Sequence, residues 1–277
     1  MSSTSETTIR QLTWNDLVFA AFLGEMVGWN QLRADWERLM VTEPDGCFLI
    51  ECQGSPAGTA TTTTYGTDLG WIGMVLVHPD FRRRGLATAL LNRCMKYLLD
   101  EKKVQCVKLD ATPEGRKVYA KLGFQEEFEL ARWSGHCIPG NPVGDGEGNW
   151  NTYAALDREA FGSDRRTYLE ELSKNSCDGF FGQRGYGLLR EGRIARYLGP
   201  VVAESSGPGR TIVLNLLRAS ESHPVFWDIP EENQAAVSLA EELGFERKRR
   251  LVRMWMGKKN AAGRSDLQWA IGAPETG

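Results

Sequence analysis

The sequence lacks the cysteine and histidine patterns of metal-binding and disulfide-rich proteins. Its six cysteines stand at positions 47, 52, 94, 106, 137 and 177, none of them in a C-x-x-C pair, and the chain has three histidines. Cysteines scattered in this way predict free thiols in a reducing compartment, and neither a zinc site nor a disulfide framework. We therefore expect no metal ion and a cytoplasmic location.

Long apolar runs and an excess of one charge are missing too. No uninterrupted apolar stretch reaches the roughly 18 residues of a membrane span, and the polar opening MSSTSETT lacks the apolar core of a signal peptide. The net charge is −3, which provides no general attraction for nucleic acid. The 277 residues are 42% hydrophobic and 25% charged, as in globular proteins of one large or two ordinary domains. We expect neither a membrane nor a nucleic-acid partner.

A weak internal repeat divides the chain. Residues 107–133 and 225–257 share one order: a short apolar strand ending in Asp, a turn with Pro, a helix, an L-G-F triplet and an alternating strand. The aspartates are Asp110 and Asp228. In each triplet the glycine suits the left-handed position that ends a helix, and the phenylalanine begins the next strand.

This repeat predicts an α/β (α+β) fold of two tandem mixed-sheet domains, at 1–134 and 150–257. The glycine- and proline-rich residues 135–149 are expected to form a linker. Residues 258–277 are expected to form a loosely packed polar tail, although Leu267, Trp269 and Ile271 could dock. In the first domain the patterns predict a hairpin over 48–66, strands over 70–79 and 104–111, and helices over 83–100 and 114–122.

The stretch HPDFRRRGLATALL, residues 78–91, places three arginines and a glycine between a strand and an apolar-faced helix. The first N–H groups of a helix have no intrahelical partner and the helix dipole is positive there, so such an end binds anions readily. Gly85 and Ala87 carry no bulky side chain, and a phosphate could approach the backbone closely. A solvated basic turn is the alternative interpretation.

The pattern V-x-P-x-x-R-x-x-G-x-A resembles the acetyl-CoA motif of the GNAT superfamily of N-acetyltransferases. That motif is (Gln or Arg)-x-x-Gly-x-(Gly or Ala), and here it falls on Arg82, Gly85 and Ala87. The preceding strand is similar to the splayed strand whose backbone pairs with pantetheine in that family. The later segment YAKLGF matches the family's helix with the general-acid tyrosine, which would be Tyr119. The resemblance covers about residues 9–133.

The resemblance implies acetyl-CoA as the cofactor and a set of residues that would hold it. Thr112 departs from the family, which often has Asn at this position, seven residues before the tyrosine. The implied cofactor-binding residues are Val75, Leu76, Val77, Arg82, Arg83, Arg84, Gly85, Leu86, Ala87 and Thr112.

Acetyl transfer to an amine needs a polarised thioester carbonyl, a deprotonated amine and a proton for the departing thiolate. A backbone N–H at Leu76 or Val77 is the expected polariser, because a splayed strand leaves ladder groups free. Tyr119 is the expected acid, because the ordinary tyrosine pKa of about 10 keeps the phenol protonated at neutral pH. A core aromatic at helical spacing is the alternative for this tyrosine.

The general base stays open among Glu25, Asp68 and Asp110, and a water chain could replace it. We favour a structural role for Asp110, as a cap of the next helical turn, because the second copy keeps the aspartate without the tyrosine. The first two helices shape the acceptor pocket in this superfamily, which makes Glu25, Trp29 and Asn30 candidate substrate residues. Trp29 and Asn30 could equally be a buried anchor and a helix cap.

The second copy looks GNAT-like but lacks the cofactor pattern. Ala240 stands where the tyrosine would fall, Pro208 removes a backbone donor from the glycine turn 207–210, and a helix is expected only over 211–219. The whole arrangement resembles a bacterial subgroup of two-domain GNAT proteins. The second domain could close the acceptor cleft, form the surface of a homodimer or bind a regulatory ligand.

These features predict an acetyl-CoA-dependent N-acetyltransferase that acts on a primary amine by direct attack in a ternary complex. The expected partner is a small-molecule amine rather than a peptide or protein. A non-catalytic acyl-CoA-binding sensor is the alternative from another functional class. A third interpretation keeps the fold and exchanges the acyl group, for example for succinyl or propionyl.

Overall fold

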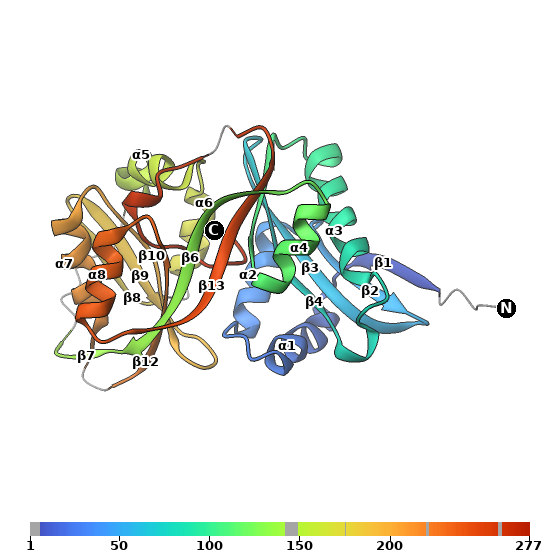
Figure 1. The fold of residues 1–277 in the computed structure, drawn as a ribbon, viewed down its shortest axis with the longest axis horizontal. Coiled ribbons are helices and arrows are strands. Elements are labelled where there is room, and N and C mark those ends of the chain that lie inside the picture. The colour runs from blue at the N-terminus through green and yellow to red at the C-terminus, as the bar shows by residue number, and fades with distance from the viewer. Residues whose placement is uncertain (1–5, 142–148, 175, 220–221, 260–261) are drawn as a thin grey trace.

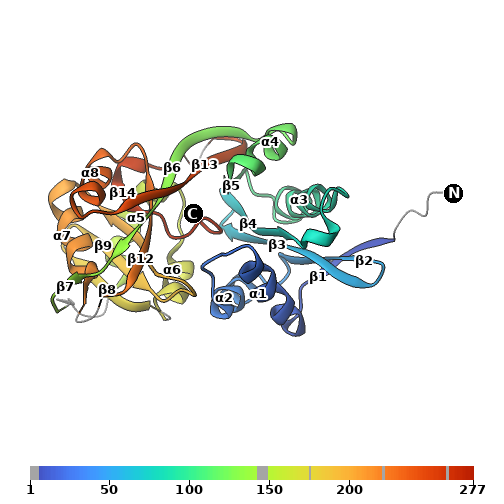
Figure 2. The same cartoon turned by 60° about the horizontal axis from the view of Figure 1, so that its bottom comes forward.

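The computed structural model describes residues 6–141, 149–174, 176–219, 222–259 and 262–277. Two halves lie side by side, and two long strands, β6 (Gln125–His136) and β13 (Glu246–Gly257), run across the boundary between them (Figure 1). The C-terminus lies between the halves in both views (Figure 1, Figure 2). None of the helices in the described ranges is long and apolar enough to cross a membrane.

The first half begins with a strand and a helix pair and then alternates strands with helices. Its helix α3 continues into a π-helical turn over Tyr97–Glu101. The elements are β1 (Thr7–Gln11), α1 (Leu17–Met26), α2 (Arg33–Thr42), β2 (Cys47–Cys52), β3 (Ser55–Tyr65), β4 (Leu69–Val77), α3 (Leu86–Lys96), β5 (Cys106–Ala111) and α4 (Pro113–Lys121).

The second half repeats this order from its own helix pair onward. Two short strands, β7 (Ile138–Pro139) and β11 (Arg218–Ala219), pair with each other apart from the main sheet. The remaining elements are α5 (Trp150–Phe161), α6 (Arg166–Ser173), β8 (Ser176–Gly182), β9 (Gly185–Arg190), β10 (Arg196–Ala203), α7 (Ser206–Leu217), β12 (Pro224–Pro230), α8 (Gln234–Glu242) and β14 (Gln268–Ala270).

Most predicted elements of the first half are confirmed. Strands β2 and β3 form the expected antiparallel hairpin, and β4, β5 and α4 lie where the patterns placed them. The glycines of both L-G-F triplets are left-handed, with φ of 95° at Gly123 and 73° at Gly244. Each of them ends a helix and turns the chain into the following long strand.

Two helix starts differ from the prediction. The helix expected from residue 83 begins at Leu86, because Arg83 and Gly85 have φ of 62° and 79° and cannot continue a right-handed helix. In the second half, α7 begins at Ser206 rather than at 211. Pro208 lies in its first turn, where the missing N–H costs no hydrogen bond.

The last strands of the two repeats are exchanged. Strand β6 follows the first half's α4 but pairs with β12, whereas β13 follows the second half's α8 but pairs with β5. Both exchanged strands also pair with each other, so one continuous sheet has the order β1-β2-β3-β4-β5-β13-β6-β12-β10-β9-β8. A sequence boundary at residue 134 or 257 therefore does not separate two sheets. The linker predicted over 135–149 lies partly outside the described residues, at 142–148, and its first residues complete β6 and form β7.

Two buried ion pairs are formed across the exchanged strands, at equivalent positions of the repeat. Arg253 on β13 lies opposite Asp110 on β5 and donates two hydrogen bonds to its carboxylate, both of 2.9 Å. Arg132 on β6 lies opposite Asp228 on β12 and donates two bonds, of 2.8 and 2.6 Å. Asp110 was expected to cap a helix, but it neutralises Arg253 instead, and Thr112 caps α4.

Helices cover both faces of the sheet and divide the core into clusters. In the first half, α3 packs on one face through Leu90 and α4 through Tyr119, and α1 and α2 pack on the other face through Leu17 and Trp36. In the second half α7 and α8 share a further cluster. A shared cluster joins residues of β3 and β4 to residues of α5 and α6, and it buries apolar surface between the halves.

The tail is packed, contrary to the expectation of a loose polar segment. Leu267, Trp269 and Ile271 are at most 5% exposed, and β14 pairs antiparallel with β10. Farther on, the carbonyl oxygens of Pro274 and Thr276 accept hydrogen bonds from the Trp71 indole and the Tyr65 hydroxyl, at 3.1 and 2.7 Å. Leu267, Trp269 and Ile271 stand at alternate positions, as in a strand with one buried face, and this strand pairs with β10 in the main sheet.

The ion pairs give a prediction for stability. Arg253→Met leaves the buried Asp110 carboxylate unpaired, and we expect it to lower the free energy of unfolding by about 3–5 kcal/mol. Adding Asp110→Leu should restore most of this loss, since a buried ion pair can be replaced by apolar residues at little cost. Urea unfolding measures both effects, with Arg116→Met as the control, because the Arg116–Glu126 pair is exposed. A loss no larger than that of the control would contradict the prediction.

Candidate functional site

Strands β4 and β5 separate after a short stretch of pairing. They pair in parallel only between residues 69–71 and 106–108, although β4 continues to Val77 and β5 to Ala111. A cavity of about 160 Å³ opens where they diverge. It is lined by Trp29, Gln31, Ile72, Gly73, Met74, Val75, Leu109, Asp110, Thr112, Tyr119, Arg132, Arg249, Leu251, Pro274 and Glu275.

The edge of β4 facing this gap carries free backbone groups. The N–H of His78 donates to the Ala57 carbonyl at 2.9 Å, toward β3. Because backbone groups of successive strand residues point to opposite edges, the N–H groups of Val77 and Val75 point toward the gap. Met74, with a φ of 50°, marks an irregularity in the pairing with β3 at this level. Of the two predicted polarisers, Val77 rather than Leu76 therefore faces the gap.

The turn before α3 presents a helix N-terminus at the end of the same gap. Gly85 is the left-handed N-cap residue of α3, and a Cβ placed on it would meet nothing within 4 Å. The residues 82–85 are exposed, and the first backbone N–H groups of α3 have no intrahelical acceptors. The turn therefore has the exposure and the free N–H groups that an anion site would need, and anion binding here stays a prediction.

The three arginines of the turn do not all have the same role. Arg82 Nε donates to the Val77 carbonyl and Arg84 Nη2 to the Asp80 carbonyl, both at 3.1 Å. Arg84 Nη1 also lies 4.0 Å from the Cys52 sulfur, and these contacts hold the turn in place. Arg83 is itself in the left-handed conformation and exposed. The structure brings Arg82, Arg83 and Arg84 together at the rim of the turn.

Tyr119 lies on α4 and lines the cavity. Its ring packs edge-on against Phe124 with 6.1 Å between ring centroids. Burial, followed by the nearby Cys94 thiol, raises the pKa of Tyr119 to about 12. The phenol is therefore protonated throughout the neutral range and keeps a proton that it could donate.

Thr112 also lines the cavity, but its hydroxyl serves α4. It is the N-cap residue and accepts a hydrogen bond of 3.2 Å from the Gly115 N–H. A hydroxyl that accepts one bond can still donate another. Capping explains a threonine here in place of the family's asparagine, since both residue types are good caps.

The three predicted substrate residues end in different places. Trp29 lines the cavity. Asn30 is buried and fixes the second half instead: its amide donates to the Ala195 carbonyl at 2.9 Å and accepts from the Ile194 and Ala195 N–H groups. Glu25 is exposed near the end of α1 and is not among the cavity-lining residues.

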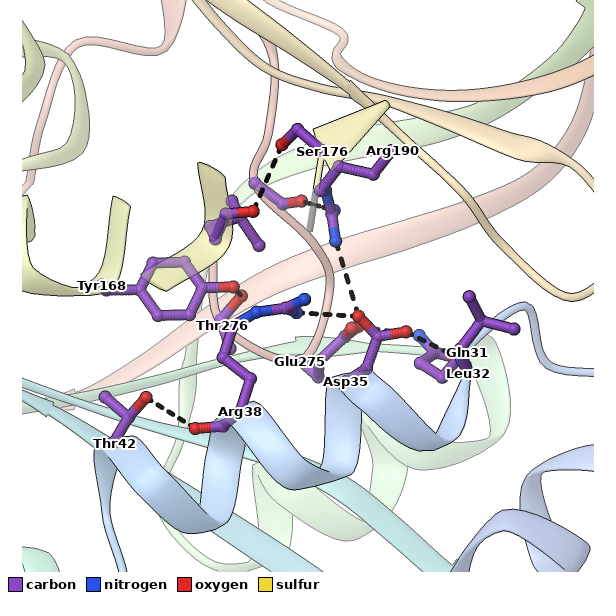
Figure 3. A network of polar contacts seen from close by, with 12 residues as sticks. Gln31, Leu32, Asp35, Arg38, Thr42, Tyr168, Ser176, Arg190, Glu275 and Thr276 are labelled. Atoms are coloured by element: carbon purple, nitrogen blue, oxygen red, sulfur yellow. Dashed lines mark hydrogen bonds and ion pairs between the residues drawn. The ribbon is translucent and has the colours of Figure 1, made fainter. Parts of the chain in front are cut away.

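The cavity is lined by two carboxylates, of which one, Asp110, was a predicted base and the other, Glu275, was not singled out in the sequence. Asp110 is engaged by Arg253, and Asp68 lies before β4, at the opposite end of that strand from the gap. The cavity's other carboxylate is Glu275, from the tail. The Gln31 amide donates to Glu275 Oε2 at 2.8 Å (Figure 3). Glu275 was missed because the tail was expected to pack loosely; its position just after the apolar alternation 267–271 was the available signal.

A polar network surrounds Glu275 at the junction of the halves (Figure 3). Asp35 on α2 accepts a 2.8 Å bond from Arg38, and Arg190 on β9 lies 3.7 Å from the same oxygen. Burial, and then the charge of Asp35, raise the pKa of Glu275, while Arg190 opposes the shift. A carboxyl group whose pKa is raised toward neutrality is a better proton acceptor than an ordinary glutamate.

The second half has the equivalent gap, but the tail fills it. Strands β10 and β12 also pair over only three residues, 196–198 with 225–227. Beyond them β14 pairs with β10, the Trp227 indole donates to the Trp269 carbonyl at 2.7 Å, and the Ile271 N–H donates to the Asp228 carbonyl. The Trp269 ring also packs directly on Gly209 in the first turn of α7. The residues that fill this gap belong to the protein itself.

Over the described ranges, no cluster of three or more His, Cys, Asp or Glu side chains could hold a metal ion. All six cysteines are free thiols, five of them buried.

Two family models match the chain, one for each half. The model of the acetyltransferase (GNAT) family matches residues 9–124, and that of the acetyltransferase (GNAT) domain matches residues 153–270. Together they confirm two tandem GNAT domains in one chain.

Curated relatives share moderate identity. An uncharacterized N-acetyltransferase of Bacillus subtilis, YitH, is 29% identical over 189 residues, which are 64% of this chain and 66% of that protein. An uncharacterized N-acetyltransferase of Methanocaldococcus jannaschii is 29% identical over 152 residues, 46% of this chain and 64% of that protein. The chain thus spans just under two thirds of the length of these relatives.

Solved structures match over nearly the whole chain. A proposed acetyltransferase from Pyrococcus horikoshii superposes with a TM-score of 0.79 and 26% identity, over 98% of this chain and 96% of that one. A GCN5-related N-acetyltransferase from Sphaerobacter thermophilus gives 0.63 with 15% identity, over 98% of both chains, and shows the same fold. The matched halves, the splayed strands and these relatives establish that the chain belongs to the GNAT acetyltransferase family.

Proposed function

We propose that the protein is an N-acetyltransferase that moves the acetyl group of acetyl-CoA to a primary amine in its first half. The observation that carries this proposal is the gap between β4 and β5, which joins an open helix N-terminus at Gly85 to a cavity containing Tyr119 and Glu275. In the second half the tail occupies the equivalent gap. One catalytic site per chain follows from this difference.

Acetyl-CoA fits the first gap on two grounds. The turn before α3 suits phosphate, because residues 82–85 are exposed, the first N–H groups of α3 have no intrahelical acceptors and Gly85 leaves the approach open. The unpaired edge of β4 at Val75 and Val77 suits the amide groups of a pantetheine arm. Acetyl-CoA would supply an activated acyl group, a thioester with a good leaving group.

The residues of the cavity, together with Val77 on the adjoining edge of β4, can supply what the transfer needs. The amine nitrogen forms a bond to the thioester carbon and the carbon–sulfur bond breaks, giving an amide and CoA thiol. Glu275 takes the proton that leaves the amine, the Val77 N–H stabilises the developing negative charge on oxygen, and Tyr119 gives a proton to the sulfur. None of the cavity-lining residues is a cysteine, which favours direct attack in a ternary complex.

The acyl-CoA-binding sensor uses the same turn but needs no proton transfer. Tyr119 and Glu275 at the divergence of the strands favour the enzyme, since a binding site alone has no use for a buried acid and base. The acyl group itself, acetyl or a larger one such as succinyl or propionyl, is decided by substrate comparison.

Cofactor binding can be tested at Gly85. Gly85→Asp places a carboxylate where phosphate would bind, and we expect it to remove the acetyl-CoA-dependent rise in melting temperature, a few degrees at saturating ligand. Gly85→Asn is the matched control, because asparagine has the same shape without the charge and also tolerates a positive φ. It should retain weakened binding. Calorimetry on the parent should give one acetyl-CoA per chain, and normal binding by Gly85→Asp would show that the phosphate site is elsewhere.

Tyr119 separates the enzyme from the sensor. Tyr119→Phe removes the proton donor and keeps the ring, and we expect kcat to fall by about 10²-fold to 10⁴-fold with unchanged acetyl-CoA affinity. Thiol release over an amine panel gives the rate, and calorimetry gives the affinity. An unchanged kcat would remove Tyr119 from the mechanism.

The pH profile tests Glu275. A base works only when deprotonated, so kcat/KM should rise as the pH passes the raised pKa of this carboxyl, above the ordinary glutamate range. Glu275→Gln should lower kcat and lose that acidic limb, because its amide cannot take a proton at any pH. The amine's own ionisation produces a rise at higher pH that both proteins share. A variant with the parent's rate and profile would place the base elsewhere.

A further inference from the structure

Arg249 is a charged residue of the cavity that the proposed transfer does not use. It lies on β13 directly opposite Arg132 on β6, and both side chains line the cavity. Residues directly opposite each other on antiparallel strands share a face, and like charges in this arrangement destabilise a sheet. Something must offset the repulsion between the two guanidinium groups.

Arg132 has a carboxylate in direct contact, whereas Arg249 has none among the described residues. Arg132 has its bidentate partner Asp228, at 2.6 Å for the shorter contact. Arg249 forms no ion pair among the described residues, and its Nε atom is buried without a hydrogen-bond acceptor. Burial, and then the charge of Arg132, lower the pKa of Arg249, while Asp228, Tyr197 and Glu275 oppose the shift without forming a hydrogen bond to it. A buried donor without an acceptor is costly, so its retention points to an acceptor that arrives from outside the chain.

The internal repeat shows that the fold does not need an arginine here. Arg249 comes four residues after Phe245, and its counterpart in the first repeat, four residues after Phe124, is Phe128. Phe128 lies opposite Arg253, as Arg249 lies opposite Arg132. The Arg253 guanidinium stacks over the Phe128 ring, 5.0 Å from its centroid. An aromatic ring therefore satisfies the packing at this position, and Arg249 replaces it only on the side of the cavity.

The same cavity also contains hydrogen-bond acceptors, on Glu275 and Gln31. The Glu275 carboxylate faces it beside Gln31, and the Gln31 Oε1 atom is a buried acceptor without a donor. A site with a guanidinium that has no ion pair, a carboxylate and one unpaired acceptor matches a small molecule that has both an anionic group and an amine. The planar fork of a guanidinium fits a carboxylate with two parallel hydrogen bonds.

We propose that the acceptor is an amine that also carries a carboxylate, such as an amino acid, and that Arg249 binds this carboxylate while the amine lies toward Glu275. This inference rests on the proposed function for the reaction of the amine. A volume of about 160 Å³ restricts the enclosed part of the acceptor to a small molecule. Arg249 is then a specificity residue, which acts on the acceptor and not on acetyl-CoA.

The test compares amines that differ only in the carboxylate. The full-length protein with acetyl-CoA is given α-, β- and γ-amino acids, each paired with its amide, and thiol release yields kcat/KM. We expect at least one free acid to exceed its amide by about tenfold to a hundredfold, the effect of a hydrogen-bonded charge. The amine of the amide is less basic and more of it is neutral at a given pH. The intrinsic reactivity of the amine would therefore give the amide the higher kcat/KM. A higher kcat/KM for the free acid shows that the protein binds the carboxylate.

Two variants link this preference to Arg249. Arg249→Phe copies the arrangement that already exists opposite Arg253, so it should fold and bind acetyl-CoA like the parent. It should lose the preference for the free acid, with a larger rise in KM than fall in kcat, because ground-state binding is removed. Arg249→Lys keeps the charge without the fork and should keep part of the preference.

Failure of the inference and failure of the transfer give different results. Equal turnover of acids and amides, or a preference that survives in Arg249→Phe, would overturn the carboxylate site while leaving the acetyltransferase intact. If no amine releases thiol, calorimetry of the amino acids on the CoA-saturated protein decides. Binding that disappears in Arg249→Phe supports the site, and binding that is absent or unchanged rejects it.

Discussion

The exchange of β6 and β13 is the constraint on which the rest of the structure depends. Each half completes its sheet with the other half's last strand, and a buried bidentate ion pair, Asp110–Arg253 or Asp228–Arg132, fixes the register of each exchanged pair. Slipping either strand by one residue would turn an arginine to the other face and leave an aspartate unpaired in the interior. The two halves are therefore locked in one arrangement, and the cavity that spans their junction has a fixed shape.

The C-terminal tail, residues 265–277, makes the gaps between strands of the two similar halves different. The tail supplies β14 to the gap of the second half, where its backbone and Trp269 occupy the position that the first half leaves open. A few residues later the same segment reaches β4 and adds Glu275 to the cavity of the first half. Under the proposed function, the segment would close one site and complete the other, which would leave one catalytic site in a chain with two GNAT folds.

Local patterns predicted the local structure well. The L-G-F turns, the hairpin, the anion-binding turn and the tyrosine helix are set by neighbouring residues, such as Gly85 and Gly123, whose conformational freedom the sequence displays directly. The strand exchange was not predictable in this way, because a strand that leaves α4 has the same alternating pattern whether it pairs with β5 or with β12. Arg249 was not singled out for the same reason, and Glu275 was missed because the tail was expected to pack loosely; both reach the Tyr119 cavity through pairings across more than a hundred residues.

The exchanged strand also determines how the chain can fold as it is made. Arg253 and Asp110 are 143 residues apart, so the first half cannot close its sheet until nearly the whole second half exists. Contacts this distant in sequence carry a large loop-closure cost and slow folding. Many N-terminal domains fold as soon as they leave the ribosome, but this first half lacks one strand of its sheet until β13 has been synthesised. Until β13 arrives, β5 remains an uncovered sheet edge, and that edge is the place where a newly synthesised chain is most exposed to aggregation.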